Sequence, residues 1–325
     1  MVQGLVGVAT SLQHTPSGDV SEPVDPHAEG LAAGVGVDHD GPKHPVVGRL
    51  PGERVSQVHG AASLRCLLVS TVREIAAALA ARTHPETTPE WDPVGLQLGD
   101  PESVVSRIAV CHEVTEDVVT AIEEDPVDLL VTYHPLLFTP TNRLLAGRSA
   151  GARSYRLLRL GVSLLVTHTD FDAAPGGAAD TLAEFFALTD VREFGGDPAE
   201  GLPAIGRYGG FQGTLATVDA MIADAFGPAG LRITGDREMT IETLAVVPGS
   251  GSSLVEAAAE VADVLVTGDV NHHRSVAAAD LGLAVVDPGH TATERPGMTT
   301  LVSMVAELSD AGVVDLTHID PKTWS

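Results

Sequence analysis

The sequence predicts an α/β fold with mostly parallel sheets that are flanked by helices, and three observations carry this prediction. Apolar runs of strand length alternate with segments of helical periodicity along most of the chain. Several runs, such as DLLVT at 128–132, are continuous strand formers, which is typical of strands buried on both faces. Polar residues follow several of these runs directly, as they do where parallel strands end at a ligand-binding crevice.

The first predicted helix lies in STVREIAAALAARTHP, residues 70–85. Val72, Ile75 and Leu79 recur there at helical spacing, Ser70 or Thr71 precedes them as a candidate N-cap, and a proline follows the helix. Strands and helices then alternate as far as residue 312. The predicted strands lie in residues 106–114, 127–135, 162–172, 239–251, 262–273 and 283–290, and the predicted helical segments in 115–124, 154–161, 178–188, 253–261, 275–282 and 291–312.

The chain divides into an N-terminal extension, residues 1–66, and a core, residues 67–321. The extension is rich in Gly, Pro, Asp and His and shows no sustained helical or strand period, so we expect it to be disordered. Scattered histidines in such a segment are more typical of a solvated tail than of a metal site.

Charge and cysteine content restrict the class of protein. The net charge of −25 argues against nucleic acid or an anionic membrane as the main partner. Cys66 and Cys111 are too few for a disulfide scaffold, which favours a reducing compartment. The chain has no continuous apolar stretch of about 18 residues, the length needed to span a membrane, and no basic N-terminal region. We therefore expect a cytoplasmic protein that does not bind membranes.

Four predicted strands end in residues that can bind a metal ion. Imidazole and carboxylate groups are the usual protein ligands of Zn, Mn and Fe. His290 and Glu294 are four residues apart, which places both on one face of a helical turn. Taken singly, each such His or Asp is more often structural, for example as a helix cap. The recurrence favours a shared site, and the segments concerned are 133–134, 168–172, 269–273 and 287–294.

Five motifs in this order resemble the GTP cyclohydrolase 1 type 2 homologs, the NIF-three-like proteins with a dinuclear metal centre. The resemblance covers about residues 68–320 and is carried by TPEWDPVGLQLGDP, VDLLVTYHPLLF, THTDFDAAPGGAADTLA, DVLVTGDVNHH and DPGHTATERPG. It implies a two-lobed fold with the metal site in the cleft between the lobes and assembly as a homohexamer. No large insertion separates the two halves of the chain, and in this respect the chain resembles the short form of the family.

The resemblance also implies a set of metal ligands: Tyr133, His134, Asp172, His290 and Glu294. Tyr133 stands where the family has a histidine, which leaves three possibilities for the second of two ions. A Tyr133 phenolate could bind a hard ion, the second site could be weakened or lost, or another histidine could substitute. The candidate substitutes are His168, His272 and His273. One or two divalent ions per subunit, Zn, Fe or Mn, are therefore expected.

The resemblance and the ligand set favour a metal-dependent hydrolase that acts on a nucleotide, a phosphoester or a cyclic amide. His168 would then serve as the catalytic proton shuttle. The alternative is a non-catalytic hexamer that scaffolds partners or buffers metal. The glycine-rich stretches 175–177 and 249–253 either form turns or offer backbone N–H groups to an anion. His112 and Glu113 also end a predicted strand, but no motif pairs with them and they have no assigned role.

Overall fold

The computed structural model describes residues 70–197, 199–227 and 230–320. The extension predicted to be disordered, residues 1–66, lies outside the described residues. Within the described ranges, none of the helices combines the length and the apolar character needed to cross a membrane.

The first sheet has the strand order β13-β4-β5-β6-β2. Its four strands β13, β4, β5 and β6 are parallel, and β2 is added antiparallel at one edge. The strands are β2 (Gly95–Leu98), β4 (Arg107–Cys111), β5 (Leu129–Thr132), β6 (Ser163–Val166) and β13 (Gly312–Asp315). A separate antiparallel pair is formed by β1 (Ser70–Thr71) and β3 (Val104–Val105).

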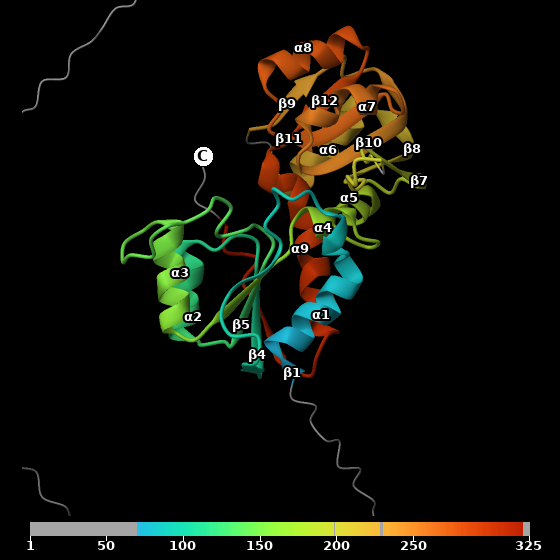
Figure 1. The fold of residues 1–325 in the computed structure, drawn as a ribbon. Coiled ribbons are helices and arrows are strands. Elements are labelled where there is room, and N and C mark those ends of the chain that lie inside the picture. The colour runs from blue at the N-terminus through green and yellow to red at the C-terminus, as the bar shows by residue number, and fades with distance from the viewer. Residues whose placement is uncertain (1–69, 198, 228–229, 321–325) are drawn as a thin grey trace, which may run out of the picture. The chain divides into compact units, whose positions relative to one another are not determined.

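Helices cover both faces of the first sheet, as its continuous apolar strands predict (Figure 1). Ile108 and Val110 of β4 pack in one cluster with residues of α1 and α9, whereas Ala109 and Cys111 pack in another cluster with residues of α2 and α3. The predicted first helix is confirmed, and the side chain of Thr71 caps it. The helices are α1 (Val72–Thr83), α2 (Glu116–Glu124), α3 (Ala150–Arg159) and α9 (His290–Ala306), with the 3-10 turn η1 (Pro85–Thr87).

The second sheet has the order β7-β8-β10-β11-β12-β9, and its central strands β10, β11 and β12 are parallel. The remaining strands are antiparallel to their neighbours, an arrangement that the sequence did not indicate. The strands are β7 (Thr189–Phe194), β8 (Gly206–Thr214), β9 (Arg232–Thr234), β10 (Thr240–Ser250), β11 (Val264–Gly268) and β12 (Ala284–Asp287).

Two apolar clusters also bury the faces of the second sheet. Leu244 and Val246 of β10 pack with residues of α5 and α6, and Ala245 and Val247 pack with residues of α7 and α8. These helices and the remaining short ones are α4 (Thr169–Ala173), α5 (Ala178–Phe185), α6 (Leu215–Phe226), η2 (Ser252–Leu254), α7 (Val255–Ala259) and α8 (His272–Asp280).

Helix α9 joins the two lobes, each of which consists of one sheet and its helices. It begins shortly after β12 and contacts β10 and β11 of the second sheet as well as β4 and β13 of the first. The start of this helix therefore lies near the carboxyl ends of strands from both sheets. The predicted two-lobed α/β fold is confirmed, and its cleft is where polar residues from both lobes meet.

Candidate metal centre

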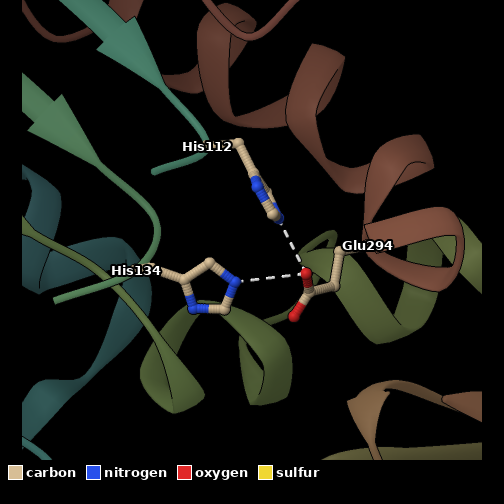
Figure 2. A group of neighbouring side chains, drawn as sticks. All are labelled: His112, His134 and Glu294. Atoms are coloured by element: carbon tan, nitrogen blue, oxygen red, sulfur yellow. Dashed lines mark hydrogen bonds and ion pairs between the residues drawn. The ribbon is translucent and has the colours of Figure 1, made fainter. Parts of the chain in front are cut away.

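His112, His134 and Glu294 form a group that could hold a metal ion (Figure 2). One ligand atom from each residue lies within 4.8 Å of the others. The carboxylate oxygen Oε2 of Glu294 lies 2.7 Å from Nε2 of His112 and 3.2 Å from Nε2 of His134. Two imidazoles and a carboxylate are a donor set that suits Zn, Fe or Mn, so the chemistry of these side chains fits a divalent ion.

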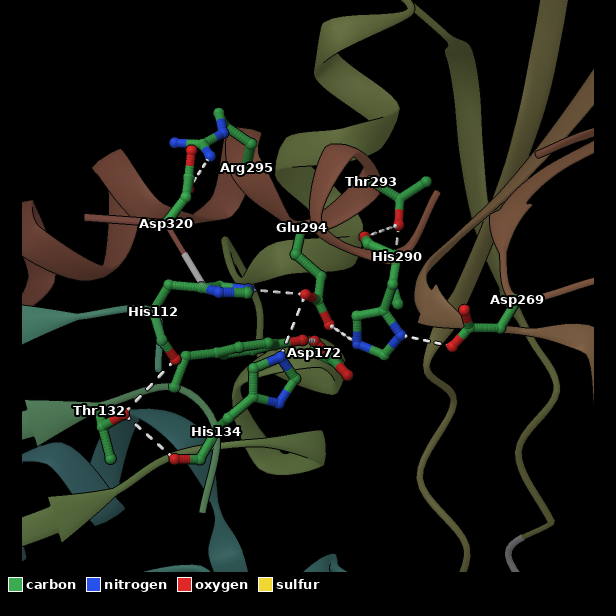
Figure 3. Close-up of polar contacts among 12 residues, drawn as sticks. His112, Thr132, His134, Asp172, Asp269, His290, Thr293, Glu294, Arg295 and Asp320 are labelled. Atoms are coloured by element: carbon green, nitrogen blue, oxygen red, sulfur yellow. Dashed lines mark hydrogen bonds and ion pairs between the residues drawn. The ribbon is translucent and has the colours of Figure 1, made fainter. Parts of the chain in front are cut away.

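The two histidines come together because β4 and β5 are adjacent parallel strands. Cys111 and Thr132, the last residues of these strands, are direct partners in the ladder. The backbone N–H of His134 donates to the carbonyl of His112 over 2.9 Å, which extends the pairing past both strand ends. Both side chains therefore lie at the carboxyl ends of these strands. Glu294 projects toward them from helix α9 (Figure 3).

The carboxylate of Glu294 is ionised although its side chain is only 2% exposed. Burial alone would raise the pKa of Glu294, but hydrogen bonds with His112, His134 and His290 outweigh burial and hold the pKa well below its usual value. Burial lowers the pKa of His134, which favours the neutral imidazole that a metal ion requires.

His290 lies beside this group and is held by carboxylates on both sides. Its Nε2 lies 2.9 Å from Oε1 of Glu294, and its Nδ1 lies 2.7 Å from Oδ2 of Asp269, the residue that follows β11. Burial lowers the pKa of His290, but these two contacts outweigh it and raise the pKa to about 9. Asp269 has a left-handed backbone with φ of 58°, which is uncommon for a residue with a side chain. A carboxylate that orients a histidine in this way is common around metal sites.

Tyr133 and Asp172 form a buried pair next to the group. The Tyr133 hydroxyl donates to Oδ1 of Asp172 over 2.5 Å. Burial, followed by the charges of Asp172 and Glu294, raises the pKa of Tyr133 well above its ordinary value, so the phenol keeps its proton. Burial also raises the pKa of Asp172, to about 7. Neither residue belongs to the group of three above, and their assignment as metal ligands stays a prediction.

His168, the predicted catalytic residue, is paired with a buried aspartate. Its Nδ1 lies 2.8 Å from Oδ1 of Asp92, whose side chain is fully buried. The other oxygen of Asp92 accepts hydrogen bonds from the backbone N–H and the hydroxyl of Thr169. Burial lowers the pKa of His168, but the hydrogen bond with Asp92 outweighs it and raises the pKa. The aspartate thus engages Nδ1 and leaves Nε2 for another partner.

The structure therefore brings together residues that the sequence did not connect. His112 had no assigned role, yet it is one of the three candidate ligands, and its buried Nδ1 has no hydrogen-bond partner in the described part of the chain. Asp92 was not singled out either, whereas Asp269 was included in the predicted polar segment 269–273 without a role of its own. The histidines offered as substitutes, His272 and His273, are exposed at the start of α8, with ring centroids 5.5 Å apart, and do not belong to the group.

Two cavities give access to these residues. One, of about 400 Å³, is lined by Tyr133, His168, Asp172, His290 and Glu294 together with apolar residues of both lobes. A second, of about 390 Å³, is lined by His112, Glu113, His134, Pro135, Phe138, His168, His290 and Thr291. Because His168 and His290 line both, the group of candidate ligands can be reached from two sides.

The comparisons with known proteins agree with this fold. Residues 70–323 match the model of the Duf34/NIF3 (NGG1p interacting factor 3) family. A GTP cyclohydrolase 1 type 2 homolog of Streptomyces coelicolor is 35% identical over 252 residues, which are 75% of this chain and 88% of the relative. The homolog of Lactococcus lactis is 33% identical over 63% of this chain and 80% of its own length.

Solved structures show the same architecture. A Bacillus cereus protein related to NIF3 superposes with a TM-score of 0.71 at 19% identity, over 79% of this chain and all of its own. A Staphylococcus aureus protein superposes with a TM-score of 0.72 at 19% identity, over 79% of this chain and 99% of its own. Together with the family match over most of the chain, these findings show that the chain belongs to the Duf34/NIF3 family of GTP cyclohydrolase 1 type 2 homologs.

Proposed function

We propose that this protein is a metal-dependent hydrolase that holds one divalent ion between His112, His134 and Glu294. The observation that carries the proposal is the convergence of these three donors within 4.8 Å at the border of two cavities. Three protein donors leave a coordination position open, as catalytic zinc sites do, whereas structural sites are closed by four. Zn, Fe and Mn all suit this donor set. His290, also predicted as a ligand, lies outside the three donors, and its Nε2, 2.9 Å from Oε1 of Glu294, would orient that carboxylate.

The ionised and neutral states of the donors support metal binding. Glu294 is held as a carboxylate, and His134 is held neutral by burial. A divalent ion at this position would polarise a substrate carbonyl or phosphoryl group and lower the pKa of water. A substrate with a phosphoester or a cyclic amide, including a nucleotide, is compatible with that chemistry, and the GTP cyclohydrolase name of the relatives points to hydrolysis as well.

His168 is placed to move a proton during hydrolysis. It lines both cavities, and its contact with Asp92 engages Nδ1, so that Nε2 can accept a proton from water. The buried carboxylate also stabilises the protonated ring that results. We assign His168 as the general base and Asp92 as the residue that positions it.

The protonated state of Tyr133 favours a site for one ion and not for two. The phenol keeps its proton and donates to Oδ1 of Asp172, and a protonated phenol is a poor ligand for a second ion. Of the three possibilities for the second ion, loss of its site is therefore the one we propose. His112, which follows β4, supplies the second imidazole of the one ion that remains. The homohexamer that the resemblance implies and the cytoplasmic location that the cysteine content and apolar pattern predict are parts of the same proposal.

Metal content tests the site. Zinc-treated and dialysed protein should contain about one zinc ion per chain by elemental mass spectrometry. His112→Ala should lower the affinity for zinc by at least about 100-fold, since the loss of a supporting partner alone costs about 10- to 100-fold. His272→Ala, which removes an exposed histidine outside the group, should bind zinc like the wild type. Equal zinc content in all three proteins would contradict the assigned site.

Turnover separates the hydrolase from a non-catalytic scaffold or metal buffer. Bis(p-nitrophenyl) phosphate and dihydrouracil are suitable probes of phosphoester and cyclic amide hydrolysis. His168→Gln should retain zinc and lose most of the turnover, because it removes the base and leaves the ligands in place. Full zinc binding without turnover of either probe in the wild type would favour the scaffold or metal-buffer alternative.

A further inference from the structure

We propose that the 400 Å³ cavity binds a compact, uncharged organic molecule with a planar or aliphatic body, and that it excludes nucleoside triphosphates. Among the substrate classes of the proposed function, this favours the cyclic amide over the phosphoester and the nucleotide. The polar end of this molecule would face the metal centre, and only that orientation rests on the proposed function. The class of ligand follows from the side chains that line the cavity, from their charges and from the hydrogen bonds of the nearby backbone N–H groups.

Away from the metal centre the lining is mostly apolar, with hydroxyl groups from Ser250 and Ser253. Trp91 contributes from the first lobe, and Leu202, Pro203, Ile205 and Leu254 contribute from the second. The ionisable residues among those lining the cavity are Tyr133, His168, Asp172, His290 and Glu294, all of which belong to the surroundings of the candidate ion. Cavities of this size with an apolar wall and a few convergent polar groups are typical of sites for small organic ligands.

The charges of the lining disfavour a phosphate chain. Among the described residues that line this cavity there is no lysine and no arginine. Two carboxyl groups, Asp172 and Glu294, lie in the wall instead. Phosphates are usually held by Arg, Lys or a cluster of backbone N–H groups. One divalent ion could neutralise part of a triphosphate, but the remaining charge would meet an apolar wall.

Three glycine N–H groups of the glycine-rich turns donate within the protein and are not available to hold an anion. The N–H of Gly249 donates to the hydroxyl of Thr293 over 2.9 Å, and the N–H of Gly251 donates to the hydroxyl of Thr267 over 2.7 Å. In the other predicted turn, the N–H of Gly176 donates to a carboxylate oxygen of Asp180 over 2.7 Å. These N–H groups are engaged inside the protein, so the turn interpretation of both stretches is the one that the contacts favour.

Trp91 gives the cavity an aromatic surface at its border. Its side chain is 60% exposed although it lines the cavity, and its ring lies 6.2 Å from that of Phe138. An exposed indole beside an apolar cavity can stack on a planar ligand. Because Trp91 is so exposed, its replacement by alanine should leave the fold intact.

Three probes test the inference by isothermal titration calorimetry on the zinc-loaded full chain: benzohydroxamate, acetohydroxamate and GTP. The two hydroxamates share a metal-binding head and differ in the apolar body. We expect benzohydroxamate to bind at least about tenfold more tightly than acetohydroxamate, because its ring buries additional apolar area. GTP should bind at least about tenfold more weakly than benzohydroxamate. Trp91→Ala should remove most of the preference for benzohydroxamate, whereas Leu281→Ala, at an exposed leucine that does not line the cavity, should retain it.

Equal affinity for both hydroxamates, or GTP binding as tight as that of benzohydroxamate, would overturn the inference while the metal site stood. A charge variant provides the converse test, since Leu202→Arg should strengthen GTP binding by adding the missing cation. If the chain binds no zinc, the proposed function fails, and the cavity is then judged on the metal-free protein with benzamide by saturation-transfer NMR. A benzamide signal that Trp91→Ala abolishes would support the inference, and the absence of a signal in the wild type would overturn it.

Discussion

The metal-free protein should lose stability as the pH rises from about 7 to about 9, because His290 is protonated in the folded state. Its pKa is raised from 6.5 to about 9: burial lowers it, but the contacts with Glu294 and Asp269 outweigh burial. A histidine with a raised pKa stabilises the fold fully below its unfolded pKa, and this contribution disappears as the pH passes the folded value. The difference between these two pKa values corresponds to about 3 kcal/mol of folding free energy, at about 1.4 kcal/mol for each pH unit. Since 34% of the side chain is exposed to solvent, we discount this to about 2 kcal/mol.

Urea unfolding in the presence of EDTA, followed by circular dichroism at about pH 6 and about pH 9.5, measures this difference. Between the two pH values, the free energy of unfolding of the wild type should fall by about 2 kcal/mol more than that of His290→Gln, whose side chain at this position does not titrate. His272→Gln is the matched control, because it removes an exposed histidine from the start of α8 and should follow the wild type. Parallel pH dependence of the wild type and His290→Gln would refute the assigned role of the charged His290.

Three further outcomes are expected. Tyr133→His should raise the zinc content from about one to about two ions per chain by elemental mass spectrometry, because it places an imidazole beside Asp172; unchanged content would mean that the tyrosine does not limit the second site. Gly249→Ala should lower the free energy of unfolding in urea by about 1–3 kcal/mol, and by more than Gly161→Ala. Both glycines have positive φ, but only a Cβ added at Gly249 would meet Oε1 of Glu294, at 2.6 Å. Zinc at 100 times its Kd should raise the free energy of unfolding by about 2.7 kcal/mol, and no change would argue against binding to the folded state.

The central strands could be predicted from the sequence because they are buried on both faces. β4, β5, β10, β11 and β12 contain runs of adjacent buried apolar residues, which give a continuous apolar signal. The antiparallel edge strands give no such signal. β7 is exposed at five of its six positions, β8 contains four glycines, and β9 has three residues. Their pairing depends on the neighbouring strand and not on a pattern of their own.

The site could be predicted only where its contacts are local or follow a strand end. His290 and Glu294 were paired from their spacing, and they are indeed in contact on the first turns of α9. His112 is 182 residues away from Glu294, so no spacing in the sequence connects the two. Asp92 lies 76 residues before His168 and precedes a short edge strand. Contacts of this range arise because elements far apart in the chain pack together, β2 beside β6 and α9 against β4. A local sequence pattern does not encode this packing.

The topology allows a metal-binding histidine to follow either of two neighbouring strands without a change in the position of the site. His112 and Tyr133 follow adjacent parallel strands whose last residues are paired, and their rings are stacked with centroids 5.6 Å apart. Side chains at the carboxyl ends of neighbouring parallel strands reach the same crevice, so an imidazole from either strand can approach Glu294. Under the proposed function, the histidine expected at the end of β5 is replaced by one at the end of β4. The double variant His112→Leu with Tyr133→His should then bind zinc, whereas His112→Leu alone should not; failure of the double variant to recover zinc binding would contradict this exchange of ligands.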